Sequence, residues 1–311
     1  MRIVFMGTPE FSVPCLERLV SDGEEVVGVF TQPDKPKGRG YEMAFSPVKE
    51  CAIKHNIPVF QPKSMKTGEA LEILKQLNPD LSIVVAYGKI LPADVLYAPK
   101  YNSINIHASL LPRYRGSAPI QWCVINGEKE SGVTSMLMDE GIDTGDMLIK
   151  DSVEITENMT AGELHDKLSE LGAEVLSKTV RALKNGELKP VKQNDDESCY
   201  APMLTKELCP VDFTKSAQEV HNSIRGLSPW PVATAVLDGK KVKIHASVLS
   251  QFTSQAQAGE IVRADGALTV MCGDGKCIDI TEIQLEGKKK MSVKDFLLGH
   301  KVEIGTIMKR G

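Results

Sequence analysis

Two polar side chains alternate with two apolar ones in the stretch 103–116, which reads Ser-Ile-Asn-Ile-His-Ala-Ser-Leu-Leu-Pro-Arg-Tyr-Arg-Gly. On a β-strand, successive side chains point to opposite faces, so Asn105 and His107 lie on one face and Ile104 and Ile106 on the other. An Asn-x-His pair commonly does no more than satisfy local backbone groups. Its position at the carboxyl end of a predicted strand favours a role in chemistry instead.

A carboxylate follows another apolar, strand-like run, in the stretch Met-Asp-Glu-Gly-Ile-Asp-Thr-Gly-Asp at 138–146. The glycines that bracket Asp143 permit unusual backbone angles and a tight loop. A carboxylate beside a histidine can hold the imidazole in one tautomer, raise its basicity, or accept a proton through water. Acidic loops are commonly plain turns, so Asp143 gains weight only together with Asn105 and His107.

The strands that must position these residues follow a βαβ rhythm through the first 190 residues, because short β-branched runs alternate with segments of 3.6-residue apolar spacing. Continuous apolar runs such as residues 82–86 predict strands buried on both faces. We therefore expect an α/β fold with a mostly parallel, Rossmann-like sheet and a ligand crevice at the strands' carboxyl ends. The predicted strands are Ile3–Met6, Val26–Thr31, Val59–Phe60, Ile83–Ala86, Ile104–His107 and Val133–Met138.

The turn after the first strand argues against a nicotinamide enzyme. It reads Gly7-Thr8-Pro9, with one glycine where the dinucleotide fingerprint GxGxxG has three. Thr8 can cap the following helix and Pro9 suits its first position. The turn therefore begins a helix without encoding a pyrophosphate site.

Composition indicates an ordinary globular protein of two domains, with 311 residues, 42% hydrophobic and 25% charged. The chain has no run of about 18 apolar residues and does not open like a signal peptide, so we expect a soluble, cytoplasmic protein. The seven cysteines lack the spacing of a metal site or a disulfide framework, and we expect neither.

A polar segment divides the chain, and we predict a first domain at 1–189, a linker at 190–206 and a second domain at 207–311. The second domain alternates strand patterns with tight turns, which predicts a small β-barrel or sandwich. Residues 206–311 carry 15 Lys and Arg against 12 Asp and Glu, whereas the whole chain has a net charge of −4. A mildly basic module suits a polyanionic partner, although on the charge alone plain solvated hairpins are the favoured explanation.

Residues 33–45 are rich in proline, glycine and lysine, and we expect a surface loop without helix or strand. Arg39 stands between Gly38 and Gly40 in this loop. A flexible, basic loop beside a crevice places Arg39 well for reaching a phosphate.

Taken together, these stretches resemble the 10-formyltetrahydrofolate-dependent formyltransferase family along the whole chain. Asn105-Ile-His107 followed by Ser109-Leu-Leu-Pro112, and Asp143 within Gly-Ile-Asp-Thr-Gly, are similar to its catalytic trio and folate-binding signature. Residues 30–40, 112–119 and 226–231 resemble the branch that formylates the methionine carried by initiator tRNA. The resemblance implies a formyltransferase fold followed by an OB-like barrel.

The resemblance also implies a role for each residue. Attack of an amine on the formyl group of folate creates a tetrahedral oxyanion, for which Asn105 and His107 would supply N–H donors. Asp143 would orient His107 and help to remove the proton of the amine. No metal is implied, and we expect a monomer. The residues implied to bind folate are Gly88, Lys89, Leu91, Ser109, Leu110, Leu111, Pro112 and Asp139, and those implied to contact tRNA are Arg39, Lys240, Lys241, Lys243 and Lys288–Lys290.

Two alternatives stay open beside transfer of formyl from 10-formyltetrahydrofolate to the α-amine of methionyl initiator tRNA. A formyltransferase of the same fold could act on a sugar-nucleotide amine or on glycinamide ribonucleotide, although the latter enzymes lack a domain like 207–311. A folate- or RNA-binding module without catalysis would need a broken trio, and Asn105, His107 and Asp143 are all present.

Overall fold

A computed structural model describes residues 1–37 and 42–311, so the predicted tRNA contact Arg39 lies outside the described residues. The chain forms two compact units that interleave along the sequence. The first comprises Met1–Gly116, Ser131–Val153 and His165–Tyr200, and the second comprises Ser117–Glu130, Glu154–Leu164 and Ala201–Gly311. The predicted domain boundaries at residues 189 and 206 stay a prediction.

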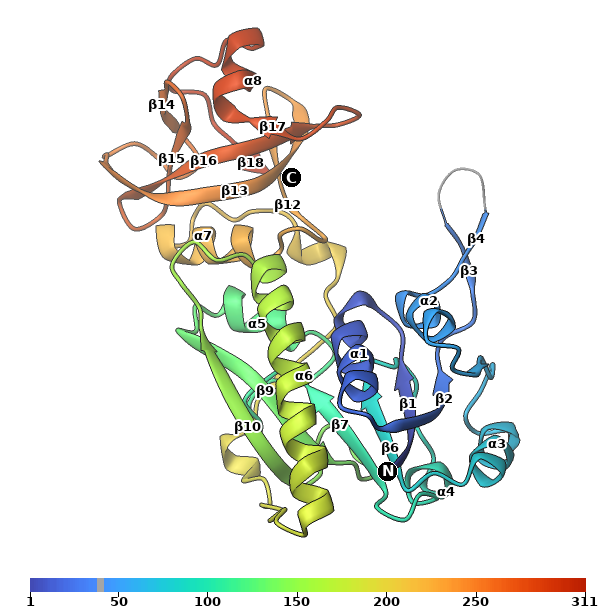
Figure 1. Cartoon of the computed structure of the whole chain (residues 1–311). Helices are drawn as coiled ribbons and strands as arrows, with labels where there is room; N and C mark the ends of the chain where they lie inside the picture. The colour runs from blue at the N-terminus through green and yellow to red at the C-terminus, as the bar shows by residue number, and fades with distance from the viewer. Residues whose placement is uncertain (38–41) are drawn as a thin grey trace. The chain divides into compact units, whose positions relative to one another are not determined.

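A seven-stranded sheet forms the centre of the first unit. Its strands are β1 (Arg2–Gly7), β2 (Glu25–Phe30), β5 (Val59–Phe60), β6 (Leu81–Val85), β7 (Ser103–His107), β9 (Glu130–Leu137) and β10 (Met147–Glu154). Their order is β10-β9-β7-β6-β1-β2-β5 (Figure 1). The strands β1, β2, β5, β6 and β7 are mutually parallel, and β9 is antiparallel to β7. The predicted mostly parallel, Rossmann-like sheet is therefore confirmed.

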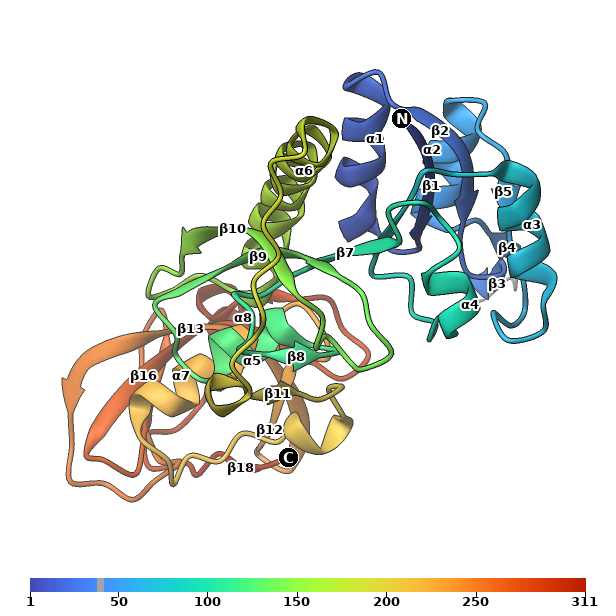
Figure 2. The ribbon, with the colours of Figure 1, turned by 90° about the horizontal axis from the view of Figure 1, so that it is seen from below.

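Helices cover both faces of this sheet (Figure 2). They are α1 (Val13–Ser21), α2 (Pro47–Lys54), α3 (Glu69–Leu77), α4 (Ala93–Leu96) and α6 (Ala161–Asn185). On one face, a methyl group added at Gly172 of α6 would touch both Ile106 of β7 and Cys15 of α1. On the other face, one hydrophobic cluster joins β1 and β6 to Leu74 of α3 and Leu96 of α4. All five residues of β6 are buried, as a strand covered on both faces requires.

The segment 33–45 contains a short hairpin, so the prediction that it forms no strand is wrong. Its two strands, β3 (Lys35–Lys37) and β4 (Glu42–Ala44), pair antiparallel, with Pro36 opposite Met43. Each strand of a two-stranded ladder keeps one unpaired edge, which is where a strand tolerates proline. A proline therefore weakens the sequence signal for a strand without preventing an isolated hairpin.

An antiparallel sheet dominates the second unit. Its strands are β12 (Ala233–Leu237), β13 (Lys240–Thr253), β14 (Ile261–Ala264), β15 (Leu268–Met271), β16 (Lys276–Leu285), β17 (Met291–Ser292) and β18 (Lys309–Arg310). They follow the order β14-β15-β16-β13-β12-β18, with β17 beside β16. The sheet curls into a half-barrel, which confirms the predicted small barrel (Figure 1). Two short strands elsewhere, β8 (Arg115–Gly116) and β11 (Tyr200–Ala201), form a separate ladder.

Three helices belong to the second unit, namely α5 (Pro119–Ile125), α7 (Ala217–Gly226) and α8 (Val293–Gly299). Of these, α7 has the clearest start signal in its side chains. It begins with a capping box, in which the Ser216 hydroxyl accepts from the Glu219 N–H and the Glu219 carboxylate accepts from the Ser216 N–H. Its buried face includes His221 and Arg225, two residues that a core seldom contains.

Across the residues that the structure describes, no helix combines the length and apolarity needed to cross a membrane. The seven cysteines are all free thiols, and six of them are buried.

Candidate active site

Asn105 and His107 lie on one face of β7, as the alternating pattern predicts. Ile104 and Ile106 on the opposite face are 0% and 2% exposed, so burial of these two side chains fixes the register of the strand. His107 is only 6% exposed and Asn105 is partly buried. The imidazole of His107 is thus largely desolvated, whereas the Asn105 side chain stays partly open to solvent.

Two oxygen atoms face the imidazole of His107. Its Nε2 lies 2.9 Å from the backbone oxygen of Tyr114, so Nε2 carries a hydrogen and donates to that carbonyl. Its Nδ1 lies 3.7 Å from Oδ2 of Asp143, which is an ion-pair distance but too long for a hydrogen bond. The ring is therefore fixed through Nε2, and Nδ1 is the nitrogen left to face a reacting group.

The carboxylate of Asp143 joins the other two residues. Its Oδ2 accepts a hydrogen bond from the Gly116 N–H at 2.8 Å, and its Oδ1 lies 3.5 Å from Nδ2 of Asn105. Asp143 itself has a φ of 55°, a left-handed conformation that Asp tolerates better than most residues. The structure thus brings Asn105, His107 and Asp143 together from two segments of the chain.

The loop that carries Asp143 approaches from an unexpected direction. Because β9 is antiparallel to β7, the loop after β9 starts beside the beginning of β7, where the Met138 N–H donates to the Ser103 carbonyl at 2.9 Å. The loop then doubles back, so Asp143 reaches Asn105 and His107 from above the sheet face. The three side chains therefore do not all project from the carboxyl ends of parallel strands.

Gln193, which the sequence analysis did not identify, holds this loop. Its Nε2 donates to the carbonyls of Asp143 and Gly145, both at 2.8 Å. Glycine is required at position 145, because a Cβ atom there would lie 1.7 Å from the carbonyl oxygen of Leu137. Gln193 is 50 residues from Asp143 and no local pattern marks it.

Asp139, which the family resemblance places beside folate, also shapes this loop. Its Oδ1 accepts from the Gly141 N–H at 3.0 Å and from the Thr144 hydroxyl at 2.7 Å. These two bonds close the turn that precedes Asp143. A role for Asp139 in binding folate stays a prediction.

The main chain of the segment 109–112 is held by the buried side chain of Thr134. The Thr134 hydroxyl donates to the Ser109 carbonyl at 2.7 Å and accepts from the Leu111 N–H at 3.1 Å. Leu111 is 1% exposed, Pro112 is buried and Leu110 is partly buried. The segment is consequently a rigid wall, whose predicted contact with folate is not tested.

The segment 88–91 contributes little through its side chains. Nζ of Lys89 donates to the carbonyls of Pro62 and Lys63, and burial lowers the pKa of this amine. Leu91 is 5% exposed and belongs to the core, while Gly88 has a φ of 76° that favours glycine. Apart from the Ile90 side chain, which is 73% exposed, this segment can therefore offer a ligand mainly its main-chain groups.

The predicted tRNA contacts in the second unit lie at its surface. Lys241 and Lys243 are exposed on one face of β13, because Val242 and Ile244 between and beyond them are buried on the other. Lys240 is exposed at the start of the same strand, and Lys288–Lys290 are exposed in the turn before β17.

One cluster of possible metal ligands is present among the described residues. Ligand atoms of Glu17, Cys51 and His55 all lie within 4.8 Å of one another. The Glu17 carboxylate is already contacted by His55 Nε2 at 2.8 Å and by the Lys54 ammonium at 3.0 Å. Burial, with the nearby Glu17 charge, raises the pKa of the Cys51 thiol to about 12. The Glu17 carboxylate is thus already hydrogen-bonded, and the Cys51 thiol is neutral. The Lys54 ammonium occupies the place beside the carboxylate that a cation would take.

Comparison with known proteins adds two kinds of finding. Residues 1–180 match the family described as formyl transferase, and residues 203–301 match its C-terminal domain. The chain is 51% identical to the methionyl-tRNA formyltransferase of Caldanaerobacter subterraneus subsp. tengcongensis and 47% identical to that of Clostridioides difficile. Both alignments cover 99% of this chain and 100% of the relative.

Solved structures share the fold at lower identity. The sugar 3N-formyl transferase WlaRD, crystallised with dTDP and 5-N-formyl-THF, has a TM-score of 0.69 and 23% identity, covering 93% of this chain and 99% of its own. HypX from Aquifex aeolicus with tetrahydrofolic acid has a TM-score of 0.63 and 19% identity, covering 98% of this chain and 50% of its own.

Proposed function

The chain belongs to the formyl transferase family, and we propose that it transfers the formyl group of 10-formyltetrahydrofolate to the α-amine of methionyl initiator tRNA. The observation that carries the chemistry is the meeting of Asn105, His107 and Asp143 on one face of β7. The identity of the acceptor is supported by about 50% identity to methionyl-tRNA formyltransferases over nearly the whole chain. The sugar formyl transferases share the fold at 23–24% identity, which supports no choice of acceptor.

The reaction needs stabilisation of one negative charge. The amine nitrogen bonds to the formyl carbon, and the carbonyl oxygen becomes an oxyanion of a tetrahedral intermediate. Asn105 suits this oxygen, because its Nδ2 is only loosely engaged by Asp143 at 3.5 Å and an amide nitrogen carries a second N–H that can donate to another acceptor. Donors aimed in advance at such an oxygen contribute about 3 kcal/mol each in comparable sites.

His107 and Asp143 are placed to take up the proton that the attacking amine releases. An α-amine has an ordinary pKa near 8, so about a tenth or more is neutral at cellular pH and a strong base is not required. Nδ1 of His107 and the Asp143 carboxylate lie 3.7 Å apart, and both are acceptors that a single attacking amine can reach. In our proposal the proton leaves the attacking amine through this pair. Collapse of the intermediate breaks the bond between the formyl carbon and N10, and N10 takes up a proton.

A folate-type donor fits the family and the folate-bound neighbours. We place its pterin against the main chain of 88–91 and the wall 109–112, with Asp139 shaping the third side. This placement is supported by the internal bonding of these segments, which leaves backbone groups rather than mobile side chains to recognise a planar ring. Rigid, prearranged donors of this kind lose little entropy when a ligand binds.

The tRNA contacts in our proposal come from both ends of the chain. Arg39 in the segment 33–45 would reach the acceptor stem, and Lys240, Lys241 and Lys243 would contact phosphates. Lys241 and Lys243, exposed on one face of β13, place two positive charges side by side, and contacts of this kind to phosphates need no base recognition. Sequence discrimination between tRNAs must then come from elsewhere on the molecule.

The deciding experiment offers three amines to the purified chain with formyl-labelled 10-formyltetrahydrofolate: methionyl initiator tRNA, methionyl elongator tRNA and a UDP-aminosugar. We expect label on the initiator tRNA, with a kcat/KM at least tenfold above that for the elongator tRNA. Label on the sugar and none on either tRNA would replace our acceptor with the sugar nucleotide. No label on any amine would refute the formyltransferase assignment itself.

A further inference from the structure

A largely buried arginine joins the loop that carries Asp143 to the chain that follows α6. Arg115 immediately precedes Gly116, whose N–H donates to the Asp143 carboxylate, and its side chain is only 11% exposed. Its Nε donates to the amide oxygen of Gln193 at 3.0 Å, and its guanidinium donates to the Asp195 carboxylate at 2.8 Å. An arginine buried without partners is costly, so these two bonds account for its place in the fold.

The amide of Gln193 is hydrogen-bonded at both of its ends. Its nitrogen donates to the carbonyls of Asp143 and Gly145, and its oxygen accepts from Arg115. A rotation of the amide by half a turn would bring its oxygen against two carbonyl oxygens and its nitrogen against a guanidinium, which has no acceptor. All of these bonds would then be lost. Arg115 therefore determines which end of the amide faces the loop that carries Asp143.

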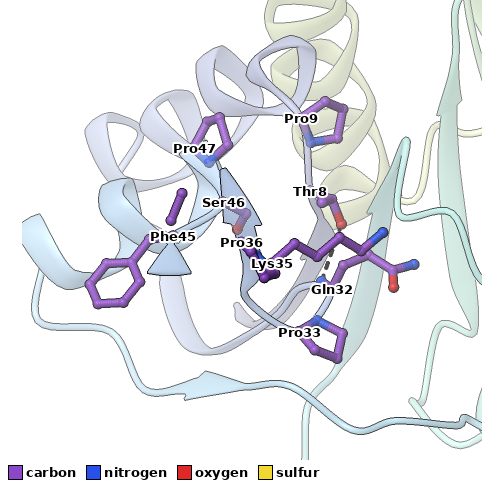
Figure 3. Close-up of a pocket in the computed structure, with 10 residues that line it drawn as sticks. Thr8, Pro9, Gln32, Pro33, Lys35, Pro36, Phe45, Ser46 and Pro47 are labelled. Carbon is purple, nitrogen blue, oxygen red and sulfur yellow. Dashed lines mark hydrogen bonds between the residues drawn. The ribbon is translucent and has the colours of Figure 1, made fainter. Parts of the chain in front are cut away.

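A second glutamine of the same protein provides a comparison. Gln32 lines the pocket at the base of the β3–β4 hairpin (Figure 3), and its amide nitrogen also donates to two carbonyls, those of Tyr87 and Gly88, at 3.1 and 3.0 Å. Within the part of the chain that the structure describes, the amide oxygen of Gln32 accepts no hydrogen bond. A glutamine can thus hold two carbonyls without a cation behind it. The arginine is an addition at the loop that carries Asp143, where it both orients and polarises the amide.

The segment 193–199 also contacts the other side of the catalytic trio. The Tyr114 carbonyl, which accepts from Nε2 of His107, belongs to a residue whose N–H donates to Sγ of Cys199 at 3.2 Å. The N–H of Arg115 donates to the carbonyl of Cys199 at 2.9 Å. The segment therefore holds the chain that fixes His107 as well as the loop that carries the carboxylate, and Arg115 lies where these two connections meet.

We propose that Arg115 is a positioning residue for formyl transfer, which orients the Gln193 amide and through it the loop that carries Asp143. The inference rests on the proposed function and adds a residue that acts without touching the donor or the acceptor. Asp143 lies 3.7 Å from Nδ1 of His107 and 3.5 Å from Nδ2 of Asn105, so its contacts are already at their limit. A further displacement of about 1 Å can slow such a reaction by up to about 10².

The test compares Arg115→Met and Gln193→Ala with the variant that carries both changes. Methionine keeps an unbranched stem and removes every donor of the guanidinium. With methionyl initiator tRNA and 10-formyltetrahydrofolate, we expect Arg115→Met to lower kcat about three- to tenfold, with KM for either substrate within about twofold. The double variant should match Gln193→Ala within about twofold, because Arg115 acts only through that amide. Arg181→Met, at an exposed arginine of α6, is the matched control and should leave kcat and KM unchanged.

Three results of this comparison would overturn the proposal. A kcat for Arg115→Met equal to that of the control would show that the arginine is dispensable. Losses that multiply in the double variant would show that Arg115 acts independently of Gln193. A rise in KM for tRNA in place of the fall in kcat would show that the guanidinium contacts the tRNA directly, as a phosphate-binding arginine does.

Hydrogen–deuterium exchange gives a second reading that needs no substrate. At a temperature where thermal unfolding shows Arg115→Met to be folded, we expect faster exchange in 139–146 and unchanged exchange in 86–91, which Gln32 holds. Equal acceleration in both segments would indicate general destabilisation and contradict a specific role for Arg115. If the unsubstituted protein formylated no tRNA, the proposed function would fail, whereas exchange would still decide whether Arg115 orders the loop through Gln193.

Discussion

Asn105→Ala separates the chemical step from binding and folding. The amide of Asn105 lies 3.5 Å from the Asp143 carboxylate, which is at the limit of a hydrogen bond, and the side chain is only partly buried. Its removal should therefore cost less than about 1 kcal/mol of stability. Loss of one donor to a developing oxyanion costs about 3 kcal/mol of transition-state stabilisation, so we expect kcat to fall by roughly 10²–10³.

The assay is single-turnover transfer of labelled formyl with both substrates saturating, accompanied by equilibrium binding of folate and by thermal unfolding. Asn185→Ala, at the exposed end of α6, is the matched control and should leave all three readouts unchanged. A kcat within about threefold of the unsubstituted protein would refute the donor role. A loss of folate affinity as large as the loss of kcat would show that Asn105 binds the donor molecule instead.

Three further predictions concern other residues. Gln193→Ala leaves the carbonyls of Asp143 and Gly145 without their donor, and we expect kcat to fall about tenfold with folate affinity within about twofold, measured in the same transfer assay. Burial lowers the pKa of His221 below its ordinary 6.5, so the unfolded chain binds this proton more readily. Neutral His221 therefore contributes fully to the free energy of unfolding above pH 6.5, and this contribution is lost as the pH falls from there toward the lower pKa of the folded state. Urea unfolding between pH 7.5 and 5 should show the loss, and His221→Gln should make the free energy of unfolding less dependent on pH. Replacement of Lys241 and Lys243 by glutamine should reduce the slope of log affinity against log salt by about one per lysine in tRNA titrations, and an unchanged slope would remove them from the interface.

The sequence predicted which residues form the site, but not the contacts that hold them together. Period-two alternation placed Asn105 and His107 on one face of β7, because that pattern is local and burial of Ile104 and Ile106 enforces it. The partner of Nε2 is a backbone carbonyl, that of Tyr114, which has no side-chain signature in a sequence.

Longer-range features were missed for similar reasons. Gln193 reaches the catalytic loop across 50 residues of chain, and the antiparallel direction of β9 depends on a connection whose geometry hydrophobic periodicity does not encode. Strand structure in 33–45 was excluded because the segment is rich in proline, glycine and lysine, although a two-stranded ladder tolerates a proline such as Pro36. The identity of the acceptor rested on resemblance to a family rather than on the chemistry of single residues.

The interleaving of the two units has a consequence for how the protein is made. During synthesis, α5 leaves the ribosome long before α7, yet the two helices pack together: a Cβ atom at Gly226 would lie 2.5 Å from the Ile125 side chain. Residues 154–164 likewise pack against a residue that is synthesised later, because the guanidinium of Arg225 donates to the Met159 carbonyl at 2.9 Å. In the nascent chain, residues 117–130 and 154–164 can therefore complete their packing only after the last third of the chain has emerged. A fragment restricted to 207–311 would lack both segments and would expose the surface of α7 that they cover.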